Sequence, residues 1–507
     1  MSQQPRRPIS LSDAQAGSIV PCAVNPRFLS ARRIRIALRL GAAMVSWGIA
    51  VALYQSHKRL PDDLSFEGEV QRVAEQDVEF LYDLTYRTAS DEPRVEQQIF
   101  DRFFQIIEGA TKFVVIDAFL VHPDSSTSEP YRRLSQQLTE QLLAKKKAHP
   151  EIQIVFLTDP INTFYGCYRS DELEKLRRAG IQGIVTDLNP LRDSNPYYGS
   201  LWRTYLQWFG AAGEGWINHP LGGEQRRVTL RSVFALLNTK ANHRKLIVAD
   251  DGESFVSLVT SANPHEASSR HSNVALVVRG ALAGDLLRAE QAVARMSGVS
   301  FVMPQIHSKS DAGSTAVQLL TEGKIKAAIL RDLAACRKSD AIDLAMFYFS
   351  DRDLIGAIES AANRGVAIRI ILDPNKDAFG RQKNGIPNRP VAHELTAKFA
   401  VPVRWYETRG EQFHTKLLIV TKGNERIAYA GSANYTRRNL DDLNLEASLR
   451  VATPRESELA GKLAAYFDRI WSNDGGVYTG PYEEFRDDSA AHRLLYRFQE
   501  SFGFSSF

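Results

Sequence analysis

One stretch of the sequence occurs twice, and each copy has the pattern of two neighbouring strands. Both copies begin with a histidine and a lysine, continue through two apolar runs and end at an asparagine. The residues are His243, Lys245 and Asn263 in the first copy and His414, Lys416 and Asn434 in the second, at identical spacing. Apolar runs bounded by polar residues indicate buried strands. A duplicated pair of strands favours a fold built from two related halves.

Helices and strands alternate in the same order before each copy. The predicted order is helix, strand, helix, strand, at 95–110, 113–120, 131–148 and 152–157 in the first half and at 324–336, 342–349, 353–363 and 367–372 in the second. The loops that follow also agree, since Asp159-Pro160 corresponds to Asp373-Pro374. This alternation predicts an α/β fold of two repeated domains, each a mixed sheet covered by helices.

The two copies resemble the phospholipase D superfamily, whose signature is H-x-K-x4-D followed by G-S-x-N. Asp250 completes the first signature, with Thr260-Ser261 in place of Gly-Ser, whereas Thr421 replaces the aspartate of the second. The family resemblance gives this aspartate a structural role. It also implies two phospholipase D-like domains in a monomeric active unit, with the histidine-bearing edges meeting at one central active site.

The paired residue types suit the cleavage of a phosphodiester. Such a reaction needs a nucleophile, an acid for the leaving alkoxide and fixed positive charge beside the phosphoryl oxygens. Histidine serves in the first two roles because its pKa lies near neutral pH. We expect His243 to form a phosphohistidine, as the first motif does in two-motif relatives, and His414 to act as acid and base. The lysines and asparagines would hold the phosphoryl oxygens, with no cofactor or metal ion.

A carboxylate that orients a catalytic imidazole is a further expectation from the resemblance. Glu446 stands at the expected distance after the second asparagine, so it joins the predicted catalytic set. By spacing, Ala275 occupies the corresponding position in the first copy. Asp250 and Glu266 are the alternative carboxylates for the first copy, and the sequence does not choose between them.

An apolar run near the N-terminus, from Ile36 to Tyr54, is long enough to cross the hydrocarbon core of a bilayer. Arg39 lies near its start, where the side chain can reach the interface. An amphipathic or core helix is the alternative. Basic residues flank the run on both sides and only weakly favour a cytoplasmic N-terminus. The expected location is a membrane of the bacterial inner-membrane type, with the side of the catalytic domains left open.

The predicted domain boundaries follow from these features. They are a disordered basic N-terminus at 1–33, a transmembrane helix at 34–56, a linker at 57–91, the first domain at 92–298, a linker at 299–322, the second domain at 323–474 and a C-terminal tail at 475–507. The first domain carries an insertion at 189–240, because the segment from 159 to 243 is much longer than its counterpart from 373 to 414.

The insertion is rich in aromatic and basic residues: Tyr197, Tyr198, Trp202, Tyr205, Trp208, Phe209 and Trp216 with Arg192, Arg203, Arg226, Arg227 and Arg231. Beside a phosphodiester site this composition favours a lid, or a lip that admits a lipid head group. A subdomain with the aromatics in its own core is the main alternative, and a platform for single-stranded nucleic acid is a weaker one. A basic loop at 375–390 carries Lys376, Arg381, Lys383 and Arg389, which either hold a second phosphate or are solvated.

Together these features predict a phospholipase D-type enzyme that acts on a phospholipid at a membrane. The reaction would be hydrolysis or phosphatidyl transfer, as in cardiolipin synthases, with water or an alcohol as acceptor. A nuclease of the same superfamily is the alternative. A nuclease normally carries a larger excess of basic residues than the net charge of +4 found here. A nucleic-acid partner is therefore not expected. Three widely spaced cysteines indicate no disulfide framework and leave the compartment open.

Overall fold

The computed structural model describes residues 31–121, 131–220, 226–306, 313–378 and 381–505. The chain divides into two compact units, 1–48 and 49–507. Residues 1–30 of the predicted disordered N-terminus, 1–33, lie outside the described residues. Residues 31–33 belong to helix α1 (Ala31–His57), so the helix begins three residues earlier than predicted. Within the described part of the chain, Arg33–His57 of α1 is the one helix long and apolar enough to cross a membrane.

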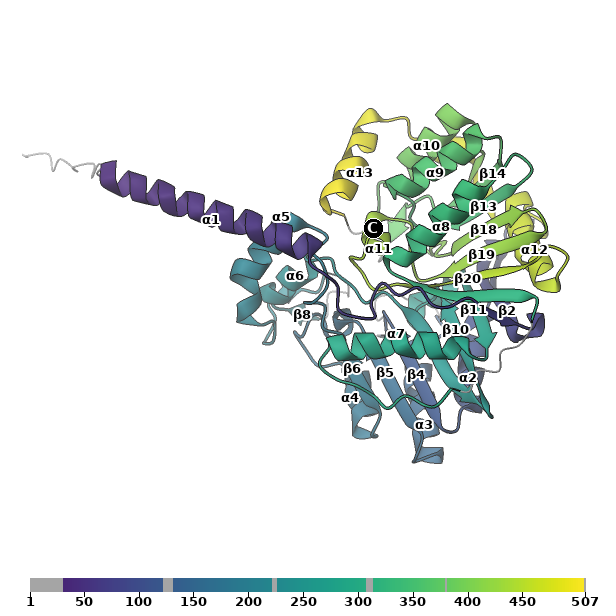
Figure 1. Cartoon of the computed structure of the whole chain (residues 1–507), viewed down its shortest axis with the longest axis horizontal. Helices are drawn as coiled ribbons and strands as arrows, with labels where there is room; N and C mark the ends of the chain where they lie inside the picture. Colours follow the sequence, from purple (N-terminus) through teal and green to yellow (C-terminus); the bar gives the residue numbers. More distant parts are fainter. Residues whose placement is uncertain (1–30, 122–130, 221–225, 307–312, 379–380, 506–507) are drawn as a thin grey trace, which may run out of the picture. The chain divides into compact units, whose positions relative to one another are not determined.

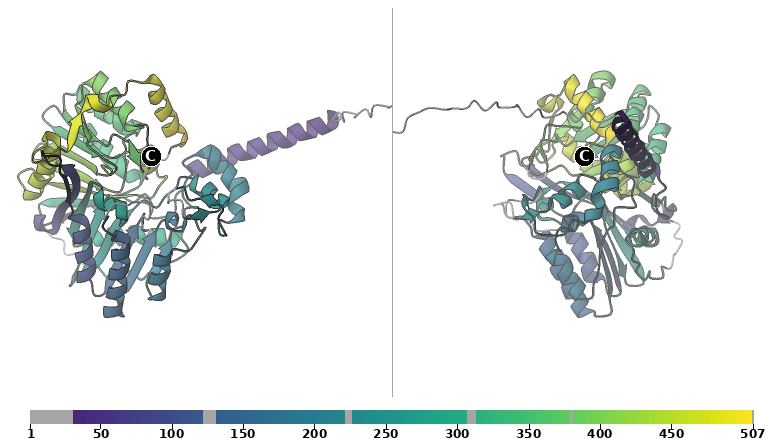
Figure 2. Two further views of the ribbon diagram at one scale, coloured as in Figure 1. Left: turned by 180° about the vertical axis from the view of Figure 1, so that it is seen from behind. Right: turned by 90° about the vertical axis from the view of Figure 1, so that its left-hand side faces the viewer.

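Two large mixed sheets form most of the second unit (Figures 1 and 2). The first sheet, in the order β3-β2-β11-β10-β9-β4-β5-β6, contains β2 (Val78–Arg87), β3 (Pro93–Glu96), β4 (Phe113–Ala118), β5 (Gln153–Thr158), β6 (Gln182–Val185), β9 (Lys245–Asp251), β10 (Ser254–Thr260) and β11 (Asn273–Arg279). The second sheet, in the order β1-β12-β20-β19-β18-β13-β14-β17-β21, contains β1 (Gln71–Val73), β12 (Thr315–Thr321), β13 (Ala341–Met346), β14 (Ala367–Leu372), β17 (Val403–Tyr406), β18 (Lys416–Lys422), β19 (Glu425–Gly431), β20 (Ala447–Pro454) and β21 (Thr479–Pro481).

The two sheets repeat one pattern. The order β11-β10-β9-β4-β5-β6 in the first sheet corresponds to β20-β19-β18-β13-β14-β17 in the second. In both sheets the two strands of the duplicated stretch pair antiparallel. In both sheets two consecutive strands joined by a helix pair in parallel. These are β4 with β5 in the first sheet and β13 with β14 in the second. This confirms the predicted α/β fold of two repeated domains with mixed sheets.

Helices cover the outer face of each sheet and also lie between the sheets. The bounds are α2 (Ile99–Gly109), α3 (Leu134–Ala148), α4 (Asp171–Arg178), α5 (Pro196–Leu201), α6 (Leu230–Leu236), α7 (Leu282–Met296), α8 (Gly323–Ala335), α9 (Arg352–Asn363), α10 (Asn388–Phe399), α11 (Arg437–Leu440), α12 (Glu458–Ser472) and α13 (Ala490–Phe502). The first sheet shares an outer core with α2, α3 and α4, and the second with α8, α9 and α10. Both sheets contribute to a central core with α7 and α12, which joins the two halves.

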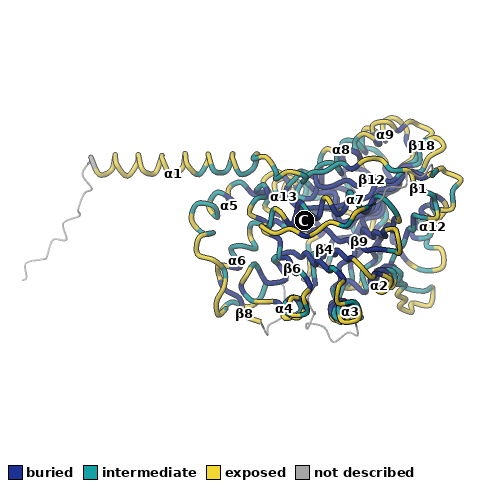
Figure 3. Tube along the Cα trace, turned by 60° about the horizontal axis from the view of Figure 1, so that its bottom comes forward, coloured by how far each residue is buried: buried dark blue, intermediate teal, exposed yellow. Residues whose placement is uncertain are grey.

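The strands that carry the duplicated stretch are buried on both faces. In β9, Leu246 and Val248 belong to the central core, whereas Ile247 and Ala249 belong to the outer core. A strand with side chains in two cores needs apolar residues at every position, which explains the continuous apolar run. Figure 3 shows this burial for the strands of both sheets, in contrast to the intermediate and exposed segments around α5 and α6.

Two segments that the sequence predicts as linkers take part in the sheets. After α1 the chain first joins the second sheet, where β1 pairs with β12, and then the first sheet, where β2 pairs with β11. The strand β12 lies in the predicted linker at 299–322, and β21 and α13 lie in the predicted tail. The sequence of β2, VEFLYDLTYR, has an apolar or aromatic residue at every second position from Val78 to Tyr86, so it carries a strand period that the linker prediction does not use. The sequence of β12, TAVQLLT, is shorter and alternates less regularly.

Candidate active site

The two histidine motifs meet where the halves exchange backbone hydrogen bonds. The amide of His243 donates to Leu445 O at 2.9 Å, so the first motif pairs with the second half. The amide of Leu445 in the second half donates to Ala241 O at 3.0 Å, just before the first motif, and in the equivalent place the amide of Ser272 in the first half donates to Gln412 O at 3.1 Å, just before the second motif. This symmetric exchange brings the duplicated motifs to one site.

Each imidazole is held by a side chain from the opposite half. His243 Nδ1 lies 2.8 Å from Glu446 Oε1, and His414 Nδ1 lies 3.1 Å from Asn273 Oδ1. A carboxylate and an amide oxygen only accept hydrogen bonds, so both imidazoles donate through Nδ1–H. In both rings this leaves Nε2 available to a substrate.

Asn273, and not Ala275, is the counterpart of Glu446. Ser261 Oγ donates to Asn273 Oδ1 at 2.9 Å, and the matching Ser432 Oγ donates to Glu446 Oε2. The spacing-based match to Ala275 is therefore wrong. The loop runs from 261 to 273 in the first copy and from 432 to 446 in the second, so the first loop is shorter and spacing alone misaligns it.

The two lysines are buried beside the histidines in equivalent positions. Lys245 Nζ donates to His243 O at 2.7 Å, and Lys416 Nζ donates to His414 O at 2.9 Å. A phenylalanine flanks each pair. Phe119 lies 4.8 Å from the His243 ring and Phe347 lies 5.0 Å from the His414 ring, measured between ring centroids. The sequence analysis missed these two residues, although each directly follows an equivalent strand, β4 or β13.

Phe119 and Phe347 also face the lysines, with Nζ to ring-centroid distances of 4.9 and 5.2 Å. An ammonium over an aromatic face is attracted by the ring quadrupole. The two phenylalanines thus hold both the imidazole and the ammonium of each motif. A signal for them exists in the sequence, since 119 and 347 follow strands that occupy the same place in the two halves.

The two asparagines are buried with unused hydrogen-bonding capacity. Asn263 Oδ1 and Asn434 Oδ1 accept no hydrogen bond from any described part of the chain. Buried polar atoms without partners are rare in folded proteins and gather at functional sites. The carboxamides of Asn263 and Asn434 are therefore available to a polar ligand.

Burial and like charges disfavour protonation throughout this site. Burial lowers the pKa of His243 to about 4, an effect that Glu446 opposes and Lys245 increases. Burial and Lys416 lower the pKa of His414 well below its usual value. Burial also lowers the pKa of Lys245 to about 7, and burial together with Lys245 lowers that of Lys416 well below its usual value. A bound anion would raise all four pKa values, so the site favours an anionic ligand.

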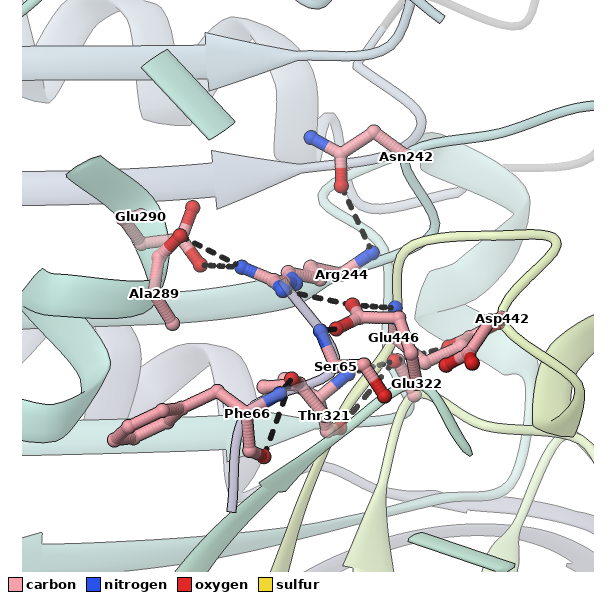
Figure 4. A network of polar contacts seen from close by, with 12 residues as sticks. Ser65, Phe66, Asn242, Arg244, Ala289, Glu290, Thr321, Glu322, Asp442 and Glu446 are labelled. Carbon is pink, nitrogen blue, oxygen red and sulfur yellow. Dashed lines mark hydrogen bonds and ion pairs between the residues drawn. The ribbon is translucent and has the colours of Figure 1, made fainter. Parts of the chain in front are cut away.

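A buried ion network lies behind Glu446 (Figure 4). The amide of Glu446 donates to Glu322 Oε1 at 3.0 Å, and Arg244 donates to the same oxygen at 2.7 Å. Arg244 also donates to Glu290 Oε1 at 3.0 Å. Burial alone would raise the pKa of Glu446, but His243 and Lys245 lower it below the usual value. Glu446 is therefore an ionised carboxylate in a fixed position.

Comparison with known proteins agrees with this arrangement. The family model described as "Cardiolipin synthase, PLD-like domain" matches residues 329–471. Human mitochondrial cardiolipin hydrolase is 30% identical over 143 residues, which are 28% of this chain and 49% of that protein. Over residues 329–471 the chain is thus similar in sequence to a phospholipase D-like domain.

The chain spans about half the length of the curated relative. The family model lies in the second half of this chain. A solved structure extends the likeness of fold to both halves. Phosphatidylserine synthase from Haemophilus influenzae Rd KW20 superposes with a TM-score of 0.56 at 12% identity, covering 91% of this chain and 98% of that one. The duplicated fold is thus shared with another solved protein over nearly the whole chain.

The paired Asp-Pro loops of the phospholipase D fold support the histidine motifs. Asp159 Oδ2 accepts from the amide of Asn242 at 2.7 Å, and Asp373 Oδ2 accepts from the amide of Phe413 at 2.8 Å. These amides directly precede the two histidines. In each loop the other carboxylate oxygen accepts from an amide two residues later in its own chain segment. This shared role explains why the loops recur in both halves.

The aspartate of the superfamily signature is structural in this chain. Asp250 accepts from the amides of Thr111, Lys112 and Phe113, at the start of β4. In the second half Asp340, directly before β13, instead accepts from an amide that follows β18. In the first half the carboxylate is thus on the motif strand β9, whereas in the second half it lies beside β13, the strand that pairs with the motif strand β18.

Glu266 Oε1 accepts from Ser135 Oγ, and Asp250 accepts from the amides at the start of β4. The alternatives considered for the first copy are thus wrong, since Asn273 is the partner of His414.

The basic loop at 375–390, predicted as a second phosphate site, uses at least one of its basic residues for the fold. The loop contains the short hairpin β15 (Asp377–Ala378) and β16 (Arg381–Gln382) and ends in α10. Arg389 donates to Pro374 O at 2.8 Å and its guanidinium lies 4.7 Å from the Phe485 ring centroid, so it serves the fold. The side chain of Arg381 lies outside the described residues. In the described ranges, no three His, Cys, Asp or Glu side chains are grouped to hold a metal ion.

Proposed function

We propose that this chain is a membrane-bound enzyme that cleaves the phosphodiester of a phospholipid and passes the phosphatidyl group to water or an alcohol. The crossed pairing of His243 with Glu446 and of His414 with Asn273 carries the proposal. It gives one site two imidazoles with free Nε2 atoms and unequal partners. Phosphodiester cleavage through a covalent intermediate requires such a pair, one to attack and one to transfer protons.

His243 is the nucleophile in this proposal. Its Nε2 forms a bond to phosphorus while the bond from phosphorus to the leaving alcohol oxygen breaks. The ring then carries positive charge, which the ionised Glu446 at Nδ1 stabilises. An ionised partner stabilises the positively charged ring more than a neutral partner would.

His414 is the acid and then the base. Its protonated Nε2 gives a proton to the departing alkoxide. In the second step the same nitrogen takes a proton from water or an alcohol, whose oxygen bonds to phosphorus as the bond to His243 breaks. The neutral amide of Asn273 stabilises the imidazolium less than a carboxylate would, so the proton is readily released.

The lysines and asparagines hold the reacting phosphate. Lys245 and Lys416 supply positive charge, and Asn263 and Asn434 supply amide hydrogens, to the two non-bridging oxygens. The anionic substrate itself favours the protonated lysines. Charge that is fixed in place before the reaction stabilises the transition state without reorganisation.

A phospholipid substrate is supported by the matched family description, cardiolipin synthase, and by the curated relative, a cardiolipin hydrolase. The membrane-length helix α1 supports the same substrate class. The mild net charge of +4 gives no comparable support for nucleic acid.

An open polar pocket supports a hydrophilic acceptor. It has a volume of about 680 Å³ and is lined in part by Arg270, Arg409 and Glu411. Arg270 precedes His271, whose ring centroid lies 5.9 Å from that of His414. The pocket therefore lies on the side of the site where the proposed base would activate an acceptor. Charged walls of both signs suit a polyol or another polar alcohol better than an acyl chain.

The test supplies labelled phosphatidylglycerol in vesicles, with and without a primary alcohol, and single-stranded DNA in a parallel reaction. Labelled phosphatidic acid alone identifies a hydrolase, and cardiolipin or phosphatidyl-alcohol identifies a transferase. The variants His243→Ala and His414→Ala should each be inactive in every reaction. DNA cleavage with intact lipid, or full turnover by either variant, would overturn the proposal.

A further inference from the structure

Two helical segments of this chain expose apolar stripes instead of burying them. The first lies in the insertion, where α5 continues into a π-helical turn and a 3₁₀ turn over 202–209. Tyr197, Leu201, Tyr205 and Trp208 recur at helical spacing along this path, and all are exposed, Trp208 to 73%. The alternative of a packed aromatic core is therefore wrong for this stripe.

The second stripe lies on the C-terminal helix α13. Tyr496 and Glu500 face the protein and are buried. Leu494, Phe498 and Phe502 recur every fourth residue on the outward side and are exposed, Leu494 to 71%. A surface helix normally turns its apolar stripe to the core and its charges outward. The outward apolar stripe of α13 thus lacks a cover within the described chain.

The two stripes form one continuous surface. The ring of Tyr197 lies 5.9 Å from that of Phe502 and 6.3 Å from that of Phe504, between centroids. Phe504 in turn stacks on Phe498 at 5.8 Å. Residues 197–209 and 494–504 are here called the apolar surface. It joins segments from the first half and from the C-terminus.

The apolar surface begins beside the end of α1. The amide of Asp193 donates to Gln55 O at 3.0 Å, and Arg192 Nε donates to Lys58 O at 2.8 Å. Lys58 Nζ donates to Asn189 O at 3.1 Å. These three bonds fix the first residues of the insertion to the last turn of α1 and to Lys58, the residue that follows it. A spanning helix leaves the bilayer at its end, so residues bonded to that end lie at the membrane surface.

We propose that the apolar surface inserts into the interfacial layer of the same membrane that α1 crosses. This inference rests on the membrane helix of the proposed function, and it adds a second attachment that orients the catalytic unit. Exposed tryptophan, tyrosine and phenylalanine side chains suit this layer, which accepts apolar rings and polar atoms together. Contiguous exposed apolar patches of this kind mark interaction sites on soluble surfaces.

Details of the apolar surface suit a lipid environment. The indole N–H of Trp208 donates to Thr204 O at 3.1 Å, so its ring can enter an apolar layer without an unsatisfied donor. Tyr205 and Tyr197 add hydroxyl groups that can remain at the head groups.

Docking would also place the active site at the membrane. Glu500 of α13 accepts from the amide of Arg437 at 2.6 Å, three residues after Asn434. Arg437 also donates to Ser194 O at 3.3 Å in the insertion. The segment that follows Asn434 is therefore bonded to α13 of the apolar surface and to the insertion just before its first stripe. A lipid head group entering at this edge would travel only a short way from the bilayer.

The test measures the depth of single labelled positions in the full-length protein. The protein is placed in vesicles of phosphatidylcholine and phosphatidylglycerol that contain nitroxide-labelled lipid. Cys22→Ser removes one thiol, and Cys167 and Cys336 are buried, so an environment-sensitive fluorophore reacts with an added cysteine. Trp208→Cys and Phe498→Cys report on the two stripes.

Val302→Cys is the matched control. Val302 is 76% exposed and accepts a hydrogen bond from Gln153 at the start of β5, whereas the active site lies beyond the end of that strand. We expect blue-shifted, nitroxide-quenched emission at 208 and 498 and neither effect at 302. Equal emission and equal quenching at all three positions would overturn the proposal. It would also be overturned if the fluorophores at 208 and 498 were shielded by a second copy of the chain in detergent and were not quenched in vesicles.

A second readout separates this proposal from the proposed function. The triple variant Trp208→Ser, Phe209→Ser and Phe498→Ser should lose several-fold in turnover of vesicle phospholipid and keep its turnover of a water-soluble diester, bis(p-nitrophenyl) phosphate. The quenching measurement needs no catalysis, so it stands even if no phospholipid is cleaved. Unchanged turnover of vesicle lipid by the triple variant would contradict a docking role.

Discussion

His243 and His414 differ in the charge of the residue that holds them. Glu446 is an ionised carboxylate beside His243, whereas Asn273 offers a neutral amide oxygen to His414. A nitrogen that bonds to phosphorus leaves its ring positively charged, and a carboxylate stabilises that charge. A proton donor instead benefits from a partner that holds the proton less firmly. This difference supports His243 as nucleophile and His414 as acid and base.

Exchanging the partners should change the two histidines in different ways. Glu446→Gln removes the charge at His243 and should lower kcat by on the order of 10²- to 10⁴-fold. Asn273→Asp adds a charge at His414, favours its protonated form and should move the alkaline limb of the kcat/KM profile up by about one pH unit. The pH profiles of both variants check this. An unshifted alkaline limb in Asn273→Asp would show that another group is the acid.

Anion binding should draw protons into the site. Burial lowers the pKa of Lys245 to about 7, so this amine is largely neutral near pH 8, and burial together with Lys245 lowers the pKa of Lys416 well below its usual value. A bound anion raises these pKa values and the lysines take up protons. Titration calorimetry with sulfate in two buffers of different ionisation enthalpy should show net proton uptake at pH 8 and weaker binding at pH 8 than at pH 6. Binding without proton uptake would mean that the lysines are already charged.

At the scale of elements, one carboxylate ties the motif strand to its neighbour in each half. Asp250 does so from the end of β9, and Asp340 does so from the start of β13. The replacement of the second signature aspartate by Thr421 is therefore matched by a change elsewhere in the same sheet. The Thr421 hydroxyl accepts from Arg426 Nε at 3.2 Å instead.

Asp250→Asn should destabilise the fold by about 2 kcal/mol or more, because an amide N–H₂ would face backbone N–H donors. Burial raises the pKa of Asp250, but its backbone hydrogen bonds lower it to a net value below the usual 3.8. The stabilisation by the ionised Asp250 is thus present above about pH 4 and is lost as the pH falls through the folded-state pKa. The difference in unfolding free energy between the unchanged protein and Asp250→Asn should therefore shrink in acid. Denaturant unfolding at pH 7 and pH 3 measures this.

Asp251→Asn is the control for that measurement. Asp251 is the next residue, and its ion pair with Arg279 is largely exposed. Its loss should cost less than about 1 kcal/mol. If Asp250→Asn and Asp251→Asn lowered the unfolding free energy equally, Asp250 would have no special structural role.

The strands and helices of the repeat were predictable because burial on two faces leaves a continuous apolar run, as in β9 and β18. The duplicated spacing predicted that the histidines, lysines and asparagines of the two motifs lie at one site, and their catalytic roles remain a prediction. Asn273 was not predictable, because a shorter loop moves it out of register with Glu446. Phe119 and Phe347 occupy equivalent places in the two halves, but only their packing against the imidazoles reveals what they contact.

At the scale of the molecule, the two halves complete each other's site. Each half supplies a histidine, a lysine and an asparagine, and each orients the histidine of the other. The shared core with α7 and α12 holds the halves in this relation. A single chain therefore contains the whole proposed site.

Activity should survive metal chelation. Lys245 and Lys416 supply the charge that a metal ion supplies in other phosphodiesterases. Turnover of phosphatidylglycerol should be unchanged by dialysis against a strong chelator. Complete loss of turnover, with rescue by one divalent ion, would contradict the proposed chemistry.

The central claim is the covalent attachment of the phosphatidyl group to His243. The most direct measurement mixes the protein with phosphatidylglycerol labelled in its phosphate, stops turnover rapidly in alkaline denaturant and maps the label by peptide mass spectrometry. We predict label on His243 in the unchanged protein and none in His243→Ala. Label on His414 instead, or turnover with no labelled histidine, would contradict the claim.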